Sequence, residues 1–548
     1  MFASREAEAF IASLADPETT QRQLLLTQMI EPNVACEFGR RHGFDKIASV
    51  ADFQAAVPIH NYDGFASAID RIVQHGEQGV LTTEPVKRFF LTSGSTNRSK
   101  YIPVTRTFIR AKSRTFGIYW SLVFRDHPEV EAARMVTNFS DSGDPVKAPG
   151  GLPCSSESAY WAQVTRATQR TARPIIPKAV AQVGDSDARY YAIARILLEE
   201  DFSVIMTLNP STIVLLLQKV AEHASRLADD IERGGIGADV AVTDDVRTYI
   251  ADNYRGDPAR ADVVRQLVAS GRVLAHELWP GLSLAICWRS PMLSPYIDLL
   301  RPHFGDQVVS RDYILMASEG VMAVPLSDGG SGGAVALGSH FYEFVPEEEY
   351  ERSDRRALLP HELEVGRTYV VILTNGAGLY RYDIGDVVRV VRFVERTPVI
   401  EFLHRAGSTC SLTGEKLTED QVTAAVADTA GDLGMAIEGF TLAPAPEGFP
   451  RYVALVEFSQ PPGAEALRRF PARLDEALEA HNVEYGSKRS SQRLAAPELW
   501  VVREGGYATR RRQRLASGAS DSQIKPTHLT RDPSFAEQFD IGQRVHAD

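Results

Sequence analysis

Apolar positions in the first ninety residues recur with the spacing of helices. Asp16 and Pro17 form a helix start, a capping carboxylate followed by proline in the first turn. The segment "RQLLLTQMI" follows with apolar residues three and four apart. We therefore predict a helical N-terminal region whose residues serve packing rather than chemistry.

From Phe89 onward, short apolar runs typical of strands alternate with helical patterns. Such runs occupy residues 89–91, 133–139, 202–208 and 282–288. Between the last two, "STIVLLLQKVAEHASRLADDIERGG" predicts one helix that opens on Ser211 and stops at a glycine pair. Strand, crossover helix and strand in this order predict a largely parallel sheet with helices on its faces.

The pattern changes twice more toward the C-terminus. Residues 333–410 are rich in strands separated by turns, as in a small antiparallel sheet or distorted barrel. After about residue 405 the segments read helix, two strands, helix, strand, a small α+β unit. We predict an α/β protein, α+β overall, with a large N-terminal domain (1–404) of mixed and parallel sheets, helices and a small β-barrel-like part. A small mobile C-terminal domain (405–548) would follow a hinge near 405–412.

Length and charge narrow the class of protein. A chain of 548 residues is long enough for two or more domains, and 44% hydrophobic with 24% charged residues is typical of a folded protein. A formal net charge of −12 disfavours nucleic acid as a partner, and the longest apolar runs are too short for a membrane span. Charged residues among the first eight positions argue against a signal peptide, so we expect a cytoplasmic protein without a membrane partner.

Two features allow competing interpretations. The four cysteines lie far apart without a Cys-x-x-Cys pair, which indicates reduced thiols in a core rather than disulfides or a zinc site. The cluster "TRRRQR" at 509–514 fits a solvated arginine face, or a patch that contacts an anionic partner.

The segment "LTSGSTNRSK" has the parts of a polyphosphate cradle. Gly94 allows close approach of backbone amides to an anion, and Lys100 supplies positive charge. Three hydroxyl residues can donate to phosphate oxygens: Ser93, Ser95 and Thr96. The segment lacks the Gly-x-x-x-x-Gly-Lys-[Ser/Thr] pattern, so it is not a Walker loop.

Two further segments carry candidate ligands. "ILMASEG" ends an apolar run with Ser318 and Glu319, and a carboxylate at a strand end can hold Mg²⁺, although a surface or capping glutamate has the same pattern. "GLYRYDIGDVVRV" puts Asp386 after a glycine at the start of a strand, where a carboxylate can accept both ribose hydroxyls or simply lie in a turn.

In their order along the chain, these segments resemble the Gretchen Hagen three family of acyl-acid amido synthetases. That family is a branch of the adenylate-forming superfamily, together with acyl-CoA synthetases, luciferases and adenylation domains. The resemblance covers nearly the whole length and rests on segments such as "CEFGRRHGFDKI", "ELWPGLSL", "HFYEFVP", "AGLYRYDIGDVVRV", "GEKLTEDQV" and "ASGASDSQIKPTHL".

The resemblance implies a two-step ligation with ATP and Mg²⁺. A carboxylic acid would be adenylated with release of pyrophosphate, and an amine, usually an amino acid, would then displace AMP to form an amide. Ser93, Gly94, Ser95, Thr96 and Lys100 would belong to or flank the phosphate loop. Ser318 and Glu319 would form the nucleotide and magnesium motif, and Asp386 would bind ribose. Lys525 would be the catalytic lysine of the C-terminal domain, and Arg405 matches the arginine before the superfamily hinge.

The sequence departs from the family pattern at two positions. Asn97 stands where the phosphate loop usually has a glycine, and Leu315 where an aromatic residue usually lies near adenine. Tyr313, two positions earlier, would share the strand face of Leu315 if the segment is extended.

The acid pocket would lie between the helix after the phosphate loop and the strands before Glu319. Its candidate walls are Tyr119, Trp120, Trp288, Tyr313 and Leu315. These aromatic side chains favour an apolar or aromatic acid, although aromatics at helical spacing also fit plain core.

Three functions fit this pattern. The first is an amide-forming ligase. The second is a ligase whose acceptor is coenzyme A or a carrier-protein thiol, which uses the same adenylate. The third is a non-catalytic ligand-binding descendant, for which Asn97 and Leu315 are the only signs. The sequence identifies neither the acid nor the acceptor.

Overall fold

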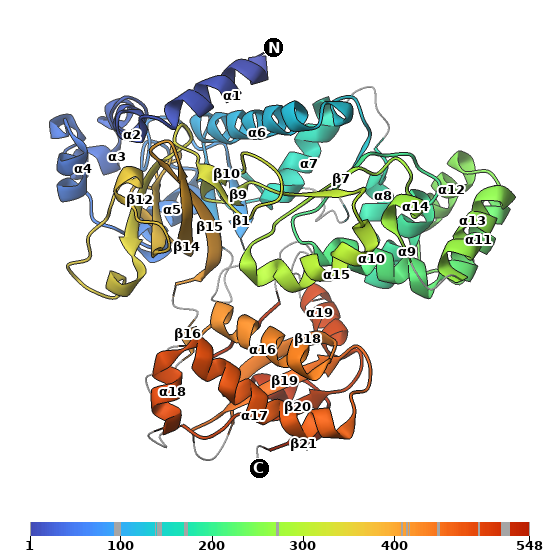
Figure 1. Ribbon diagram of the computed structural model, residues 1–548. Helices are drawn as coiled ribbons and strands as arrows, with labels where there is room; N and C mark the ends of the chain where they lie inside the picture. Colours follow the sequence, from blue (N-terminus) through green and yellow to red (C-terminus); the bar gives the residue numbers. More distant parts are fainter. Residues whose placement is uncertain are drawn as a thin grey trace. The chain divides into compact units, whose positions relative to one another are not determined.

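The protein is described from a computed structural model, in which two compact units appear, Met1–Phe402 and Leu403–Asp548. The structure describes residues 2–92, 100–137, 139, 145–168, 174–269, 273–406, 409–410, 412, 415, 417–446, 450–490, 494–516 and 526–546. Figure 1 gives the elements along the chain.

The N-terminal region is helical, as predicted. Asp16 caps the second helix, where its carboxylate accepts a hydrogen bond from the Thr19 amide at 3.1 Å and Pro17 occupies the first turn. The "RQLLLTQMI" segment completes this helix and then widens into a π-helical turn, Leu25–Ile30. The helices are α1 (Phe2–Ser13), α2 (Pro17–Leu24), α3 (Glu37–Arg41), α4 (Val50–Ala56) and α5 (Tyr62–His75).

A four-stranded sheet carries the segment between Phe89 and Val104. Its order is β2-β1-β5-β4, in which β1 pairs antiparallel with β2 and parallel with β5. The strands are β1 (Arg88–Thr92), β2 (Lys100–Val104), β4 (Val146–Lys147) and β5 (Pro153–Ser155). The long helix α6 (Arg106–Asp126) leaves β2, and α7 (Glu157–Thr168) follows β5.

A parallel sheet of four strands lies at the centre of a second core. Its order is β3-β6-β7-β8 and all of its pairings are parallel, which confirms the predicted crossover topology. Its strands are β3 (Met135–Val136), β6 (Val204–Met206), β7 (Leu284–Cys287) and β8 (Val309–Asp312). Helices gather around it in Figure 1: α8 (Lys178–Ala181), α9 (Ser186–Leu197), α12 (Asp244–Asn253), α13 (Pro258–Ala269), α14 (Ala275–Leu278) and α15 (Ser294–Phe304).

The prediction of a single helix that begins at Ser211 is wrong in one respect. The segment forms two helices, α10 (Ser211–Glu222) and α11 (Ala224–Arg233), because His223 leaves the helical conformation at ψ 18°. The break brings Leu216 and Leu227 into one core, whereas a straight helix of this length would run past the short sheet. The predicted stop at the glycine pair is confirmed by Gly234, whose φ of 73° ends α11.

The strand-rich part forms a seven-stranded sheet in the order β12-β13-β14-β15-β11-β10-β9. The pairings of β11 with β15 and of β12 through β14 are antiparallel, as predicted for residues 333–410. Strands β9 and β10, which lie before the predicted range, extend the sheet by antiparallel pairings from β11. The strands are β9 (Leu315–Ala317), β10 (Gly320–Val324), β11 (Gly333–Val335), β12 (Phe341–Pro346), β13 (Thr368–Thr374), β14 (Tyr382–Val394) and β15 (Thr397–Arg405). This sheet shares one core with the N-terminal helices and α6.

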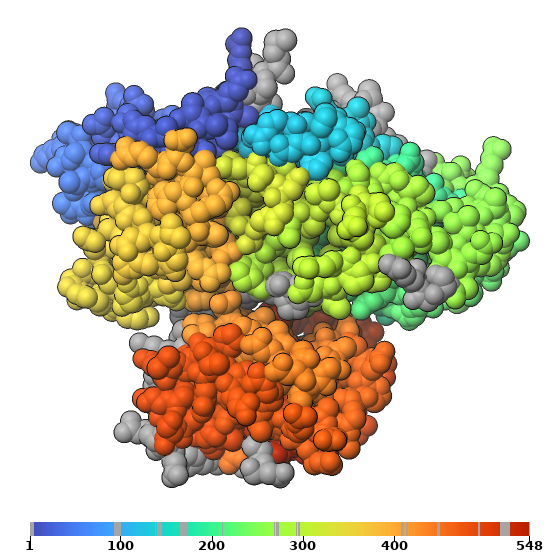
Figure 2. Space-filling model, viewed as in Figure 1, coloured from blue at the N-terminus to red at the C-terminus, as the bar shows by residue number. Residues whose placement is uncertain are grey.

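The second unit is α+β, as predicted, and its residues are orange to red in Figure 2. Its sheet has the order β18-β19-β20-β21, and Thr418 begins α16 with a reciprocal capping box to Gln421. The elements are α16 (Glu419–Leu433), β18 (Ile437–Pro444), β19 (Tyr452–Phe458), α17 (Ala464–His481), α18 (Val483–Ser490), β20 (Glu498–Val502), α19 (Gly506–Ala516) and β21 (Ile541–Val545).

The cysteines and the lengths of the helices are two further points of comparison with the sequence. The four cysteines are free and buried, as a core location requires. Among the described residues, every helix is too short or too polar to cross a membrane.

The buried His340 gives the first unit a pH-dependent stability. Burial, assisted by the charge of Lys112, lowers its pKa from 6.5 to about 3. The unfolded chain therefore binds a proton that the folded chain excludes, so this stability is complete above pH 6.5 and is lost as the pH falls toward 3. On acidification from pH 7 to pH 5, the free energy of unfolding should therefore fall by about 2 kcal/mol less in His340→Gln than in the wild type.

The measurement is the unfolding midpoint of the wild type, His340→Gln and the exposed control His75→Gln at both pH values. The wild type and the control should lose more thermal stability on acidification than His340→Gln. An equal loss in all three proteins would contradict this role of His340.

Candidate functional site

The predicted phosphate loop connects two antiparallel strands. Ser93, Gly94, Ser95, Thr96 and Asn97 lie outside the described residues, and the strands that flank them are β1 and β2. Thr92 and Lys100 are paired across this hairpin, so its two ends meet at a fixed position in the sheet. The loop therefore leaves and re-enters the sheet at one point.

Lys100 begins β2 and lies beside Tyr62, the first residue of α5. The Lys100 ammonium is 5.5 Å from the centre of the Tyr62 ring, within the range of a cation–π contact. The Tyr62 hydroxyl accepts a hydrogen bond from the Tyr101 amide at 3.0 Å. Burial raises the pKa of Tyr62, and the negative charge of Glu319 contributes in the same direction. The strand after the loop thus lies within electrostatic reach of the predicted metal ligand.

Ser318 and Glu319 form the two-residue turn between β9 and β10, in which Ala317 pairs with Gly320. Gly320 leaves no room for a side chain, because a Cβ there would lie 2.8 Å from the ring of His340. Glu319 is only 6% exposed, so it is not the surface residue that its sequence context also allowed. The Tyr382 hydroxyl lies 3.5 Å from its Oε1 atom.

The backbone of this turn is held from two sides. Asn375, after β13, donates through Nδ2 to the Glu319 carbonyl at 2.8 Å. On the other side, the Lys112 ammonium donates to the Ala317 carbonyl at 2.8 Å. Lys112 also forms an ion pair with Glu157, with 2.6 Å between Nζ and Oε1.

The predictions did not include Lys112 or Glu157. The sequence held a signal for Lys112, since it shares one helical stripe with the buried residues Phe108, Thr115 and Tyr119. A lysine on a core-facing stripe requires a buried acceptor, yet nothing local in the sequence names Glu157 as that acceptor.

Asp386 lies on β14 directly after Gly385, whose φ of 73° goes with a shift in register between β13 and β14. Asp386 is buried, with 8% of its surface exposed. At the start of the same strand, Arg381 forms a two-pronged ion pair with the buried Glu343, at 2.8 and 2.9 Å. The segment that carries Asp386 is therefore anchored in the core of the sheet.

The predicted acid-pocket residues fall into two groups. Tyr119 and Tyr313 are buried against each other, with ring centres 5.3 Å apart, and Trp120 contacts Tyr119 at 5.7 Å. Trp288, after β7, donates through its indole nitrogen to the Ile314 carbonyl at 2.9 Å.

Tyr313 and Leu315 do not share a strand, so the condition under which they would share one strand face is not met. Leu315 begins β9 of the seven-stranded sheet, whereas Tyr313 lies in the connection that follows β8 of the parallel sheet. The chain changes sheets between them, because β8 ends at Asp312, and the alternation along one strand no longer relates the two side chains.

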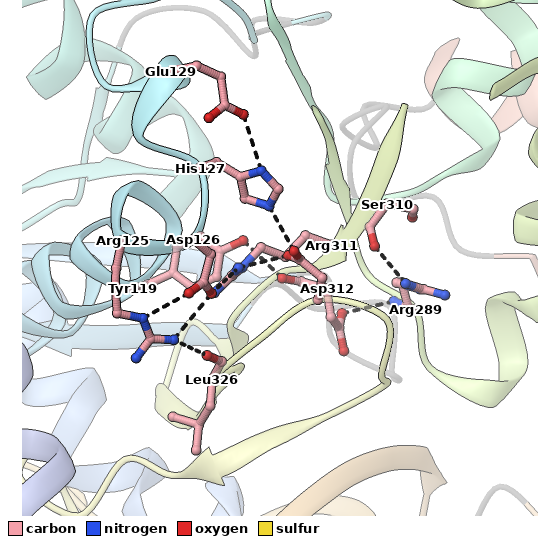
Figure 3. A network of polar contacts seen from close by, with 11 residues as sticks. Tyr119, Arg125, Asp126, His127, Glu129, Arg289, Ser310, Arg311, Asp312 and Leu326 are labelled. Atoms are coloured by element: carbon pink, nitrogen blue, oxygen red, sulfur yellow. Dashed lines mark hydrogen bonds and ion pairs between the residues drawn. The ribbon is translucent and has the colours of Figure 1, made fainter. Parts of the chain in front are cut away.

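Asp312 holds the point where the chain changes sheets (Figure 3). Its carboxylate accepts backbone hydrogen bonds from Gly332 at 2.6 Å, Tyr313 at 2.9 Å and Arg289 at 3.0 Å. Burial raises the pKa of Asp312 to about 7, and these three donors oppose the shift. The Tyr119 hydroxyl donates to the Asp312 carbonyl at 2.9 Å, which joins the acid-pocket group to this point.

The neighbouring Arg311 is fully buried and joins the end of α6 to the loop after β10. Its Nη1 atom lies 2.8 Å from both Asp126, at the end of α6, and Asp328, in the loop after β10. Asp328 also contacts the ring of His127 at 2.8 Å. The end of α6 and the glycine-rich loop are thus connected through one buried guanidinium.

Two predicted residues belong to the second unit or its border. Lys525 lies outside the described residues. Arg405 is exposed and is the last residue of β15, and the division between the two units falls within this strand, at Phe402 and Leu403.

The arginine cluster at 510–514 lies on α19 and is partly structural. Arg510 packs over the Phe535 ring at 4.4 Å and donates to Gln538 at 2.9 Å. Its burial lowers its pKa. Arg510 therefore packs against the core of the second unit and is not part of a fully solvated arginine face.

A cavity of about 360 Å³ opens elsewhere in the first unit. Its lining includes Glu84, Thr107, Arg110 and Arg114, on a different face of α6 from Lys112. Of the predicted site residues that the structure describes, none lines this cavity. Glu84 accepts a hydrogen bond from the Thr107 amide at 3.0 Å and so caps the start of α6.

The fold is that of acyl acid amido synthetases. A structure described as "AtGH3.15 acyl acid amido synthetase in complex with 2,4-DB" matches with a TM-score of 0.86, over 99% of this chain and 97% of that chain. The identity is 19%, so this likeness concerns the fold alone.

The chain belongs to the GH3 family. Models of the GH3 family N-terminal, central and C-terminal domains match residues 6–309, 333–405 and 420–534 in order. It is therefore an enzyme of the amido synthetase class of ligases, and the resemblance found in the sequence is confirmed.

Curated relatives match over nearly the full length. A probable indole-3-acetic acid-amido synthetase, GH3.12 of Oryza sativa subsp. japonica, is 25% identical over 95% of this chain and 93% of its own. A jasmonoyl–L-amino acid synthetase, GH3.5 of the same plant, is 24% identical over the same shares.

The hydrogen bond from Asn375 to the Glu319 turn can be tested by itself. In Asn375→Asp, the side-chain oxygen still accepts from the Ala377 amide at 2.9 Å, but the donor to Glu319 is lost. The unpaired buried carbonyl should lower the free energy of unfolding by about 1–3 kcal/mol. Hydrogen exchange of residues 317–320 should accelerate.

Asn375→Ala is the comparison, because it removes both hydrogen bonds without placing a charged oxygen beside the Glu319 carbonyl, and it should also accelerate exchange at the turn. Wild-type exchange at residues 317–320 in both variants would contradict the assignment.

Proposed function

We propose that the protein is an ATP-dependent ligase that adenylates a carboxylic acid and transfers the acyl group to an amine, an amino acid in the first instance. The observation that carries the proposal is the ordered match of all three GH3 domain models. The two curated relatives described above are named as a probable indole-3-acetic acid-amido synthetase and a jasmonoyl–L-amino acid synthetase.

The nucleotide would bind across the seven-stranded sheet and the β1–β2 hairpin. Ser93, Gly94, Ser95 and Thr96 would supply hydroxyl and amide donors to the phosphates, and Lys100 their countercharge. Support comes from Lys100, which begins β2 directly after this loop and lies beside Tyr62, near the charge of Glu319.

Ser318, Asp386 and Arg405 would complete the nucleotide site. Ser318 lies in the turn with Glu319, and Asp386 would accept the ribose hydroxyls from its anchored position on β14. Arg405, at the end of β15, would contact the nucleotide from the border of the second unit.

Glu319 suits Mg²⁺ as a single carboxylate ligand. Mg²⁺ is usually held by one or two carboxylates together with phosphate oxygens and water, so a larger protein cage is not required. The buried turn fixes the backbone of this carboxylate from two sides, which is the support that a metal ligand needs. When bound, the ion would neutralise phosphate charge at the reacting centre.

The reaction balances as two displacements. A carboxylate oxygen attacks the α-phosphorus of ATP, a new P–O bond forms, and pyrophosphate leaves with the electron pair of the broken P–O bond. The amine then attacks the acyl carbon, loses a proton, and AMP leaves. The first step joins two anions, so Lys100, Lys525 and the donors of the phosphate loop would offset repulsion and hold the reactants within attack distance.

Lys525 would be delivered by the second unit. A hinge near residues 405–412 would let this unit close for adenylation and turn for amide formation, which also keeps water from the reactive adenylate. The division of the chain within β15, at Phe402 and Leu403, supports a unit that can move as one body.

The acid would be apolar or aromatic. The Tyr119 hydroxyl and the Trp288 indole nitrogen already donate to backbone carbonyls, those of Asp312 and Ile314. The partly exposed side chains of Trp120, Trp288 and Leu315 would offer hydrocarbon surface to the acid, and the buried rings of Tyr119 and Tyr313 would support them.

The test of the proposal is ATP–pyrophosphate exchange across a panel of aromatic and aliphatic acids, followed by product mass with amino acids or with coenzyme A supplied separately. Exchange with a defined acid and an amide product would support the proposal. A thioester product would instead establish the coenzyme A alternative, and exchange with no acid, despite nucleotide binding, would contradict adenylation.

Glu319→Gln should lower the exchange rate at least a hundredfold, because an amide no longer neutralises Mg²⁺. The control is Glu199→Gln, which alters a buried glutamate of the helical core, paired with Arg195. The control should keep the wild-type rate. Full exchange in a folded Glu319→Gln would exclude the metal role.

Lys525→Ala should slow adenylation much more than amide formation from a supplied acyl-adenylate, since the lysine would act only in the first step. Lys488→Ala, in α18 of the same unit, is the control and should leave both rates unchanged. Equal losses in both steps for Lys525→Ala would argue against a unit that turns between them.

A further inference from the structure

Lys112 is a charged side chain in the middle of the first core. No part of its side chain is exposed, and it lies on the inner face of α6. Its ammonium is close to the rings of Phe108, at 5.2 Å, and Phe90, at 5.7 Å. Burial lowers its pKa, and the nearby Glu157 and Glu319 oppose that shift.

Glu157 is equally fixed. It opens α7, its side chain is 9% exposed, and its Oε1 atom accepts from the Lys112 ammonium at 2.6 Å. The same oxygen accepts from the Trp161 indole nitrogen at 2.9 Å. The Glu157 side chain is thus fixed in the first turn of α7 by a hydrogen bond from a tryptophan of the same helix.

Besides Glu157, the Lys112 ammonium also contacts backbone carbonyls of the β9–β10 hairpin, beside the Ser318–Glu319 turn. One donor contacts the Ala317 carbonyl at 2.8 Å, and the Ser318 carbonyl lies at 3.5 Å. Helices α6 and α7 and the β9–β10 hairpin are therefore joined at one nitrogen atom.

Stability alone does not account for a buried pair of this kind. Removing two charges from water is costly, and apolar residues of similar volume often stabilise a core equally well or better. A lysine at this place gives the hairpin what an apolar residue lacks, a directional contact to the carbonyl two residues before Glu319.

We propose that Lys112 and Glu157 are positioning residues that fix the Ser318–Glu319 turn for adenylation. The inference rests on the proposed function of Glu319. Lys112 holds the turn from the side of α6, opposite the Asn375 contact to the Glu319 carbonyl. Because a displacement of about 1 Å at a reacting centre costs on the order of a hundredfold in rate, this small contact matters for turnover.

The experiment compares Lys112→Met, Lys112→Arg and Glu157→Gln with the control Arg195→Met. Arg195 is also fully buried and ion-paired, with Glu199, but it lies in the core around the parallel sheet. Both methionine variants delete a buried cation and strand a glutamate, so a general loss of stability affects them alike.

Lys112→Met and Glu157→Gln should lower the exchange rate at saturating Mg·ATP about a hundredfold and about tenfold, with little change in the KM of the acid. Lys112→Arg should recover a large part of the rate, since a guanidinium can contact both the carboxylate and the carbonyl. Arg195→Met should keep the wild-type rate at a temperature where it is folded. A wild-type rate in folded Lys112→Met and Glu157→Gln would overturn the proposal.

Hydrogen exchange by mass spectrometry separates this inference from the proposed function, because it needs no substrate. Peptides covering residues 315–324 should exchange faster in Lys112→Met and Glu157→Gln than in the wild type and Arg195→Met. If the wild type fails to adenylate any acid, faster exchange still supports the positioning of the turn, and unchanged exchange refutes it. Should Lys112→Met not fold, Glu157→Gln, which keeps the side-chain shape, decides the same question.

Discussion

The first unit depends on the hydrogen bonds that hold the backbone of one short buried turn, Ser318–Glu319. Asn375 holds the Glu319 carbonyl and Lys112 holds that of Ala317, while Glu157 forms an ion pair with Lys112. The side chain of a metal ligand needs such fixed support, which is why this turn is central to the proposal for Glu319. Helices α6 and α7 and the seven-stranded sheet all contribute to the support.

The two sheets of the first unit meet directly before the turn. Asp312 is the last residue of the parallel sheet, and its carboxylate accepts hydrogen bonds from the backbone amides of Arg289, Tyr313 and Gly332. The seven-stranded sheet begins three residues later, at Leu315. Among the residues proposed to line the acid pocket, Tyr119 and Trp120 lie on α6, Trp288 and Tyr313 follow strands of the parallel sheet, and Leu315 begins the seven-stranded sheet. The proposed pocket thus spans the junction of the two sheets. The junction between them is short and rigidly hydrogen-bonded, as a reaction between an acid and a nucleotide requires.

The sequence predicted those parts of the structure that local patterns determine. The Asp16 cap, the parallel strands and the C-terminal α+β unit follow from spacing, capping and turn residues. The break at His223 was missed because it depends on how two half-helices share a core, and no residue near it is a strong helix breaker. Lys112 and Glu157 lie 45 positions apart, and only the three-dimensional fold brings the pair together. The roles of Ser93, Asp386 and Lys525 came from family resemblance and stay predictions.

The measurement that tests the central claim most directly is the fate of oxygen in a single turnover. An acid labelled with ¹⁸O in its carboxylate is supplied with ATP and an amino acid, and the products are weighed. Adenylation predicts one labelled oxygen in AMP and one in the amide, because the attacking oxygen stays on phosphorus when the amine displaces AMP. Label in inorganic phosphate together with ADP would contradict the account, since it would show that the acid attacks the γ-phosphorus instead.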